Sequence, residues 1–248
     1  MSPTQLHAVL GLEIAGTVDG VWPGVDALAA DDEVLGFADG GGYAEDALAT
    51  TVAPKPARLD WAAAAALPVA AETALRVLDL LEVMRGDTML IHGAAGAVGT
   101  VAVQIAVARG AAVIGTASKP NHDYLRKLGA TPVPYGGGLV DRVRAVAPDG
   151  IDAVFDAASQ GVLPESIELR GGTSRIVTIA DPDALRLGIP FSNEATRDAD
   201  ALAELARQAA DGRLRLTVAQ KYSLEEAPVA QAAVATEHGR GKIVLLVD

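Results

Sequence analysis

Residues 88–99, Thr88-Met-Leu-Ile-His-Gly-Ala-Ala-Gly-Ala-Val-Gly99, decide the fold of this 248-residue chain. An apolar run ends in glycines at positions 93, 96 and 99, and the chain continues as the apolar stretch 100–109. This pattern predicts a strand, a tight turn and a helix whose N-terminus can face an anion. Gly93 permits a tight exit from the strand, Gly96 leaves no side chain between backbone amides and a pyrophosphate, and Gly99 lets the helix pack closely. A dinucleotide is the implied ligand.

The glycines alone also fit a simple structural turn between a buried strand and an Ala-rich helix. The residues that follow favour the dinucleotide-binding interpretation. A second apolar run covers 111–117, a helix is predicted to begin near Asn121, and Gly129 closes it. Together these segments form a βαβα series, as in dinucleotide-binding folds.

The end of the second strand distinguishes between the two nicotinamide cofactors. An NAD site usually places Asp or Glu there, to accept hydrogen bonds from the ribose 2′-hydroxyl. Here the chain has Thr116, Ala117, Ser118 and Lys119 and no acid. A hydroxyl donor and an ammonium suit a 2′-phosphate, so NADPH is favoured. The alternatives are an ordinary solvated lysine at Lys119 and a helix N-cap at Ser118.

The periodicity predicts an α/β fold with a doubly wound parallel sheet covered by helices on both faces. The expected strands of this sheet lie at about 88–92, 111–116, 131–135, 152–157 and 175–180, and a further helix covers 199–211. Residues 9–60 predict a small β unit with strands at Leu12–Val18, Glu33–Phe37 and Tyr43–Leu48. The tail is expected to return to strand, helix and strand at Arg215–Val218, Glu225–Glu237 and Ile243–Val247.

The composition argues against disulfides and metal sites. The chain has no cysteine, which excludes disulfides and thiolate ligands, and its four histidines (His7, His92, His122, His238) show no metal-ligand spacing. No metal is therefore expected. His92, at the end of an apolar strand, is more consistent with a packed neutral histidine than with a catalytic one.

Charge and hydropathy argue against nucleic acid and membrane partners. The net charge is −12, and residues 1–60 hold ten acids against Lys55 and Arg58. Nucleic acid is a poor partner for such a chain. The apolar stretches are shorter than the roughly 18 residues of a membrane-spanning helix, and no signal peptide is recognised, so a cytoplasmic location is expected.

An ordered set of motifs covers nearly the whole chain. These are Gly11-Leu-Glu-Ile-Ala-Gly-Thr-Val18, Asp31-Asp-Glu-Val-Leu-Gly36, Gly41-Gly-Tyr-Ala-Glu45, Ala64-Ala-Ala-Leu-Pro68, Glu72-Thr-Ala-Leu75, Ile91-His-Gly-Ala-Ala-Gly-Ala-Val-Gly99, Ala102-Val-Gln104 and Gly241-Lys-Ile-Val-Leu245. In these motifs the chain resembles the medium-chain dehydrogenase/reductase superfamily, in its zinc-free, quinone-oxidoreductase-like branch that uses NADPH.

The resemblance implies a GroES-like β domain, residues 1–62 with 213–248 returning to it, beside a Rossmann domain at 63–212. It implies that the active site lies between them. The resemblance implies that the pyrophosphate is faced by Gly93, Ala94, Ala95, Gly96, Ala97, Val98 and Gly99, and the 2′-phosphate by Ser118 and Lys119. It implies that Thr73 lies close to the nicotinamide half. Strand ends where such cofactors are usually lined by backbone hold Ala157 and Ala158, after the fourth strand, and Ile179 and Ala180, after the fifth. Each of these is otherwise a plausible packing residue. Tyr43 is the candidate hydrogen-bond donor in the cleft, and its alternative is an aromatic packed at a domain junction.

The chain departs from the family at its start, because the Gly-x-Glu-x-Ala-Gly element begins after only ten residues. A shortened β domain with an exposed edge is therefore expected, covered by a second copy of the chain or by a different protein. A homodimer through an edge strand at Ile176–Ile179 or through the following segment is the family expectation, and its rival is a dimer with a stoichiometric partner.

Three functions follow from these observations. The first is NADPH-dependent reduction of a quinone or an activated, α,β-unsaturated carbonyl compound by metal-free hydride transfer. The second is a redox-neutral cyclase or isomerase of bacterial specialised metabolism. The third is a non-catalytic subunit that senses NADPH or binds a partner.

Overall fold

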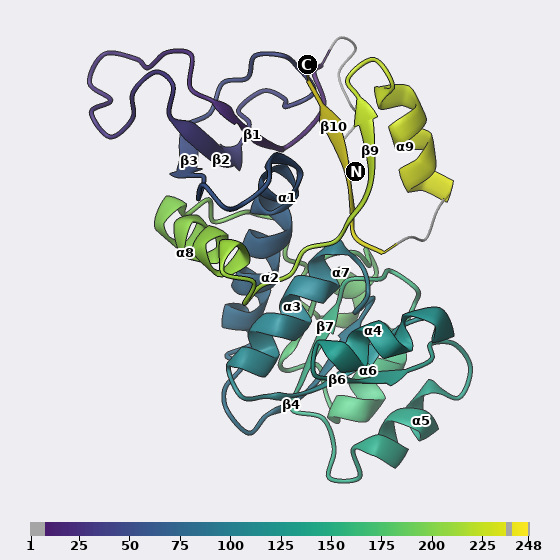
Figure 1. Cartoon of the computed structure of the whole chain (residues 1–248). Helices are drawn as coiled ribbons and strands as arrows, with labels where there is room; N and C mark the ends of the chain where they lie inside the picture. The colour runs from purple at the N-terminus through teal and green to yellow at the C-terminus, as the bar shows by residue number, and fades with distance from the viewer. Residues whose placement is uncertain (1–7, 237–239, 248) are drawn as a thin grey trace. The chain divides into compact units, whose positions relative to one another are not determined.

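The computed structural model describes residues 8–236 and 240–247, which form two compact units (Figure 1). One unit holds Thr73–Thr196, and the other holds the residues up to Glu72 together with those from Arg197 onward. Segments 63–72 and 197–212, which the sequence analysis assigned to the dinucleotide-binding domain, are thus grouped with the β unit.

The unit of residues 73–196 is built on a five-stranded parallel sheet. Its strands are β4 (Thr88–His92), β5 (Ala112–Thr116), β6 (Ala130–Val133), β7 (Ala153–Asp156) and β8 (Ile176–Thr178), in the order β6-β5-β4-β7-β8. The helices are α3 (Ala97–Ala108), α4 (His122–Lys127), α5 (Leu139–Val146), α6 (Leu163–Arg170) and α7 (Ala184–Leu187), with a short 3-10 turn η1 (Lys119–Asn121) before α4. The predicted α/β class with a Rossmann-like parallel sheet is confirmed.

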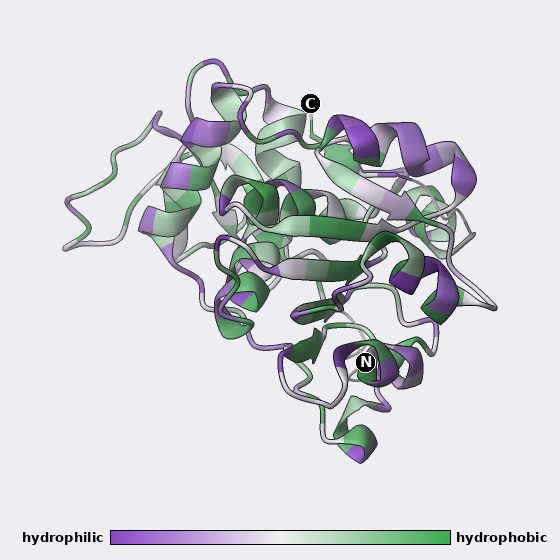
Figure 2. Ribbon diagram, turned by 90° about the horizontal axis from the view of Figure 1, so that it is seen from below, coloured by the Kyte–Doolittle hydropathy of each residue, from purple (hydrophilic) through white to green (hydrophobic). Residues whose placement is uncertain are grey.

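The strands of this sheet are apolar because both faces of the sheet are covered. Leu90, Ile91 and Phe155 are fully buried, and Figure 2 shows hydrophobic colour on the central strands and hydrophilic colour on the outer sides of helices. Continuous apolar strands, rather than alternating ones, are typical of a parallel sheet. Burying each such side chain stabilises the fold by about 2 kcal/mol.

The direction of winding reverses at β4. The chain first adds β5 and β6 on one side of β4, and then returns to add β7 and β8 on the other side. Loops that leave the carboxyl ends of β4 and β7 therefore diverge, and ligands of open α/β sheets bind at such a reversal. The glycine turn follows β4, so the topology puts this turn at the reversal point.

The other unit combines two small sheets with helices. Strands β1 (Glu13–Thr17), β2 (Glu33–Phe37) and β3 (Thr51–Pro54) are antiparallel, while β9 (Val218–Ser223) and β10 (Lys242–Leu246) form a parallel pair. The helices are α1 (Trp61–Ala66), α8 (Ala199–Ala210), α9 (Ala227–Thr236) and the first residues of α2 (Pro68–Leu80), which continues into the 73–196 unit. Within the described part of the chain, no helix combines the length and apolar character needed to cross a membrane.

Two predictions for this unit need correction. Tyr43–Leu48 is not a strand, because the third strand is Thr51–Pro54, which pairs with β2. Gly40 and Gly41 have φ values of +102° and +123°, so the backbone leaves extended geometry before Tyr43. The prediction of a strand at Arg215–Val218 is wrong in its bounds, because the strand in this region, β9, spans Val218–Ser223. The end of the predicted helix Glu225–Glu237 falls outside the described residues.

Three elements that are distant in the sequence meet at Glu13 of β1. Its carboxylate forms an ion pair with Lys242 of β10 and accepts a hydrogen bond of 2.9 Å from the backbone amide of Val69 in α2. The Glu13 side chain is 17% exposed and that of Lys242 is 22% exposed. Burial raises the pKa of Glu13, although Lys242 and the Val69 amide act in the opposite direction. This pair ties the first described strand to the last one.

Candidate dinucleotide-binding site

The turn after β4 requires glycine for geometric reasons at two positions. Gly93 has a φ of +69°, and a Cβ at this position would lie 3.1 Å from the carbonyl oxygen of Ala157. A Cβ on Gly99 would lie 2.2 Å from the Gly93 oxygen and 2.8 Å from the Ala94 Cα, both of which are main-chain atoms. Helix α3 therefore approaches the turn more closely than any residue with a side chain permits.

Gly96 is the N-cap of α3 and brings no side chain to accept hydrogen bonds from the first turn of the helix. A Cβ there would meet only the Gly93 oxygen, at 3.2 Å, so the space in front of the helix is otherwise open. Because the first amides of a helix have no intrahelical acceptor, they are available to an anion. Ala94 and Ala95 are buried, at 0% and 6% exposure, and the Ala94 amide donates to the Thr116 carbonyl, so the side chains of these two residues do not face a ligand.

The end of β5 is hydrogen-bonded to the glycine turn. Ala94 donates its amide to the Thr116 carbonyl at 3.1 Å, and the Gly93 amide donates to Thr116 Oγ1 at 3.4 Å. Two residues after Thr116 comes Ser118, which is half-buried, and the next residue is Lys119, which is exposed. The strand end that precedes the two predicted 2′-phosphate residues is thus hydrogen-bonded to the glycine turn.

The loops after β7 and β8 are held by a buried pair that the sequence analysis did not single out. Asp156 accepts the Thr178 hydroxyl at 2.7 Å, and both residues are fully buried. The second oxygen of Asp156 accepts the amide of Ala158 at 2.9 Å, and Thr178 Oγ1 accepts the amide of Ala180 at 3.1 Å. Four predicted residues, Ala157, Ala158, Ile179 and Ala180, thus sit on loops shaped by one network. The available signal was an acid directly after the apolar run 153–155.

His92 is held as a neutral side chain. Its Nδ1 lies 3.3 Å from Thr116 Oγ1, and its Nε2 lies 3.0 Å from Ser166 Oγ. The Ser166 hydroxyl donates to the Val162 carbonyl, so it accepts from His92, and the proton sits on Nε2. Burial lowers the pKa of His92 to about 4. The interpretation of His92 as a packed neutral histidine agrees with this geometry.

Comparison with known proteins identifies the family. A family model described as zinc-binding dehydrogenase matches residues 128–245. The solved quinone oxidoreductase of Coxiella burnetii is 31% identical, covers 98% of this chain and 80% of its own, and superposes with a TM-score of 0.84. This chain belongs to the medium-chain dehydrogenase/reductase superfamily and is quinone-oxidoreductase-like.

Two further relatives bear on the function of this superfamily member. A mycobacterial protein solved in complex with NADPH is 27% identical, covers 99% of this chain and 84% of its own, and has a TM-score of 0.84. A spectinabilin polyketide synthase system protein of Streptomyces orinoci is 33% identical over 95% of this chain. The chain spans 12% of the length of that protein.

Tyr43 and Thr73, the other predicted residues of this quinone-oxidoreductase-like chain, lie on different units. Tyr43 follows the glycine turn 40–42, and its hydroxyl oxygen accepts a hydrogen bond of 2.8 Å from Gln231 Nε2 in α9. Its own O–H hydrogen therefore remains available to a further acceptor. Thr73 is buried in α2, at 7% exposure. Their assigned roles remain predictions.

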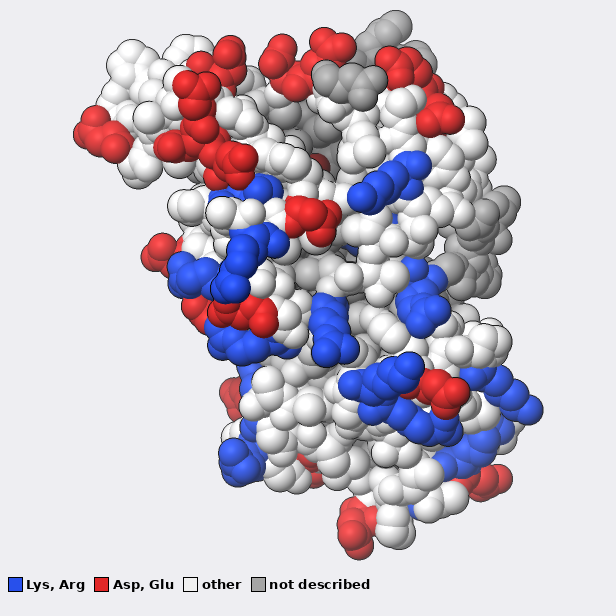
Figure 3. Space-filling model, in the orientation of Figure 1, with Lys and Arg blue, Asp and Glu red and all other residues white. Residues whose placement is uncertain are grey.

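The described residues of this superfamily member contain no group of three or more His, Asp or Glu side chains that could hold a metal ion. His7 and His238 lie outside the described residues. Acidic side chains gather over the loops around β1–β3, as Figure 3 shows.

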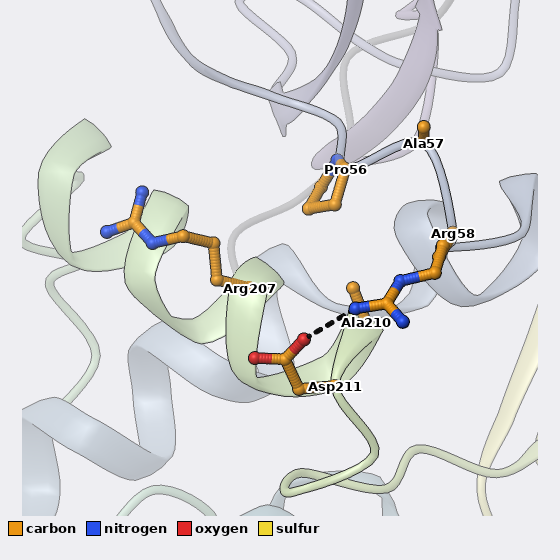
Figure 4. A pocket seen from close by; sticks show the side chains of 6 residues that line it. All are labelled: Pro56, Ala57, Arg58, Arg207, Ala210 and Asp211. Carbon is orange, nitrogen blue, oxygen red and sulfur yellow. Dashed lines mark hydrogen bonds and ion pairs between the residues drawn. The ribbon is translucent and has the colours of Figure 1, made fainter.

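A small hollow of about 250 Å³ lies between the loop after β3 and α8 (Figure 4). Arg58 points across it to Asp211, at 3.1 Å, while Arg207 points away from it and pairs with Glu204 at 3.0 Å. Asp211 also pairs with Arg213, at 3.2 Å. Each charged side chain that lines this hollow is therefore part of a surface ion pair.

The neutral state of His92 predicts a pH-dependent stability. Because the folded pKa of about 4 lies below the ordinary value of 6.5, the unfolded chain binds the proton more readily. The stability that neutral His92 provides is complete above pH 6.5 and is lost as the pH falls through about 4. Between pH 7 and pH 5 we expect this group to lower the free energy of unfolding by about 2 kcal/mol.

Denaturant unfolding of the wild type and His92→Asn at several pH values measures this effect. The His92→Asn variant should not show this decrease in the free energy of unfolding at low pH. The His122→Asn variant, which removes a partly exposed histidine, should still show it. Parallel pH profiles for the wild type and His92→Asn would contradict the prediction.

Proposed function

We propose that this chain is an NADPH-dependent oxidoreductase that reduces a quinone or an α,β-unsaturated carbonyl compound by hydride transfer without a metal. The observation that supports it most directly is the glycine turn at the sheet reversal, which is hydrogen-bonded to Thr116, the residue that shortly precedes Ser118 and Lys119 in the sequence. The Coxiella quinone oxidoreductase and the NADPH-complexed mycobacterial relative support the same reaction class.

The residues present fit a dinucleotide. Gly96 leaves the first amides of α3 open to a pyrophosphate, and Gly93 allows the backbone to turn away from the ligand. Ser118 and Lys119 supply a hydroxyl and an ammonium for a 2′-phosphate. Bound NADPH supplies a hydride for an electron-poor carbon.

Tyr43 is the proposed donor to the oxygen that gains negative charge during reduction. Gln231 occupies a lone pair of its hydroxyl oxygen, at 2.8 Å, which leaves the O–H to donate. A positioned donor of this kind stabilises a developing enolate or phenolate. Hydride transfer assisted by such a donor needs no nucleophilic side chain, and the sequence contains no cysteine.

A titration with NADPH and NADH, followed by nicotinamide fluorescence and melting temperature, tests the cofactor. NADPH consumption with quinones and enones then tests the reaction. We expect saturable binding with a clear preference for NADPH, followed by turnover. Binding of neither nucleotide would reject this proposal and favour a redox-neutral enzyme. Binding without turnover of either substrate class would favour a sensing or partner-binding subunit.

Lys119 should account for much of the preference for NADPH over NADH. We expect Lys119→Ala to weaken NADPH binding about tenfold and to leave NADH binding nearly unchanged, because only NADPH carries the 2′-phosphate. Added salt should weaken NADPH binding less in the variant than in the wild type. Lys127→Ala removes the same charge from another exposed lysine, in the last turn of α4, and should retain the preference. An equal loss in both lysine variants would contradict the assignment of Lys119.

A further inference from the structure

The hydroxyl of Ser118 is oriented by a neighbouring side chain. Asn121 Nδ2 donates a hydrogen bond to Ser118 Oγ at 3.1 Å, and the Asn121 backbone amide donates to the Ser118 carbonyl at 2.9 Å. Both residues are half-buried; Ser118 is the N-cap of the 3-10 turn η1 that follows β5, and Asn121 is the last residue of this turn. The two contacts hold the serine at a fixed place relative to the turn.

This arrangement sets the direction in which Ser118 can donate. A serine hydroxyl has one hydrogen and two lone pairs. One lone pair is occupied by the Asn121 Nδ2 donor, so the O–H hydrogen of Ser118 does not point to Asn121. The O–H hydrogen is therefore left for an external acceptor. A phosphate oxygen is such an acceptor, and hydrogen bonds to charged groups are stronger than neutral ones.

We propose that Asn121 is a positioning residue for cofactor selection: it holds Ser118 as a donor to the 2′-phosphate and so strengthens the preference for NADPH over NADH. The inference rests on the proposed NADPH binding. A neutral amide suits this task, because a carboxylate at position 121 would accept the serine hydrogen itself and would also repel the phosphate.

Nucleotide binding measures the effect without a substrate. We expect Asn121→Ala to weaken NADPH binding about fivefold, with NADH binding and the melting temperature unchanged. Asn121→Asp should weaken NADPH binding further, because it takes the serine hydrogen. Gln208→Ala, which removes an exposed side-chain amide bonded to Glu204 in α8, is the matched control and should leave both affinities unchanged.

A double-mutant cycle with Ser118→Ala separates positioning from direct contact. If Asn121 acts through Ser118, then Asn121→Ala should have no further effect on NADPH binding once Ser118 is alanine. A full Asn121 effect in the Ser118→Ala background would overturn the inference, as would an equal loss of NADPH and NADH binding. A wild type without preference for NADPH would instead reject the proposed function on which the inference rests.

Discussion

Gly99→Ala is expected to destabilise the fold by about 3 kcal/mol and to weaken NADPH binding by more than tenfold. The added Cβ would lie 2.2 Å from the Gly93 oxygen and 2.8 Å from the Ala94 Cα. Both neighbours are main-chain atoms, so no side chain can move aside, and α3 must shift away from the end of β4. That shift would displace the helix N-terminus proposed to hold the pyrophosphate.

Denaturant unfolding and a fluorescence titration measure the two effects separately. Gly137→Ala is the matched control, because a Cβ there meets no atom within 4 Å and its φ lies outside the left-handed region. The control should resemble the wild type in both measurements. A destabilised Gly99→Ala that still binds NADPH normally would leave the packing argument intact and contradict the placement of the pyrophosphate. Unchanged stability would contradict the packing argument.

Lys242→Met should lower the free energy of unfolding by about 3 kcal/mol at neutral pH, because it leaves the largely buried carboxylate of Glu13 without its cation. The methionine keeps most of the apolar volume of the lysine stem. The double variant Glu13→Gln/Lys242→Met should regain most of the loss, since neither buried charge remains. Lys221→Met, at a solvent-exposed lysine of the adjacent strand β9, should have little effect.

The pH dependence of the Lys242→Met deficit gives an independent check. The folded pKa of Glu13 already lies above its ordinary value of 4.5, and loss of Lys242 removes an influence that lowers this pKa. A group with a raised folded pKa favours folding when protonated, so its contribution is lost as the pH rises through the folded pKa. The deficit of the variant should therefore be small below pH 4.5 and grow toward neutral pH. A deficit that does not change with pH would show that the loss is not electrostatic.

The parallel sheet could be predicted closely from the sequence because its strands are short apolar runs between polar or glycine-containing turns. The predicted run 88–92 is β4, and 152–157 contains β7. The β unit was less predictable. Tyr43–Leu48 is not a strand and Thr51–Pro54 is, because short antiparallel strands depend on which segment reaches the partner strand in register.

Local pattern alone determined the strand, turn and helix at 88–109, the place of Ser118 and Lys119 after the second strand, and the family resemblance. Backbone sterics and hydrophobic periodicity act over a few residues, so a single sequence contains them. Only the tertiary structure decided which distant groups meet: Glu13 with Lys242, Asp156 with Thr178, and His92 with Ser166. Such pairs form because the fold buries polar groups that must find a partner, and sequence spacing does not encode that choice.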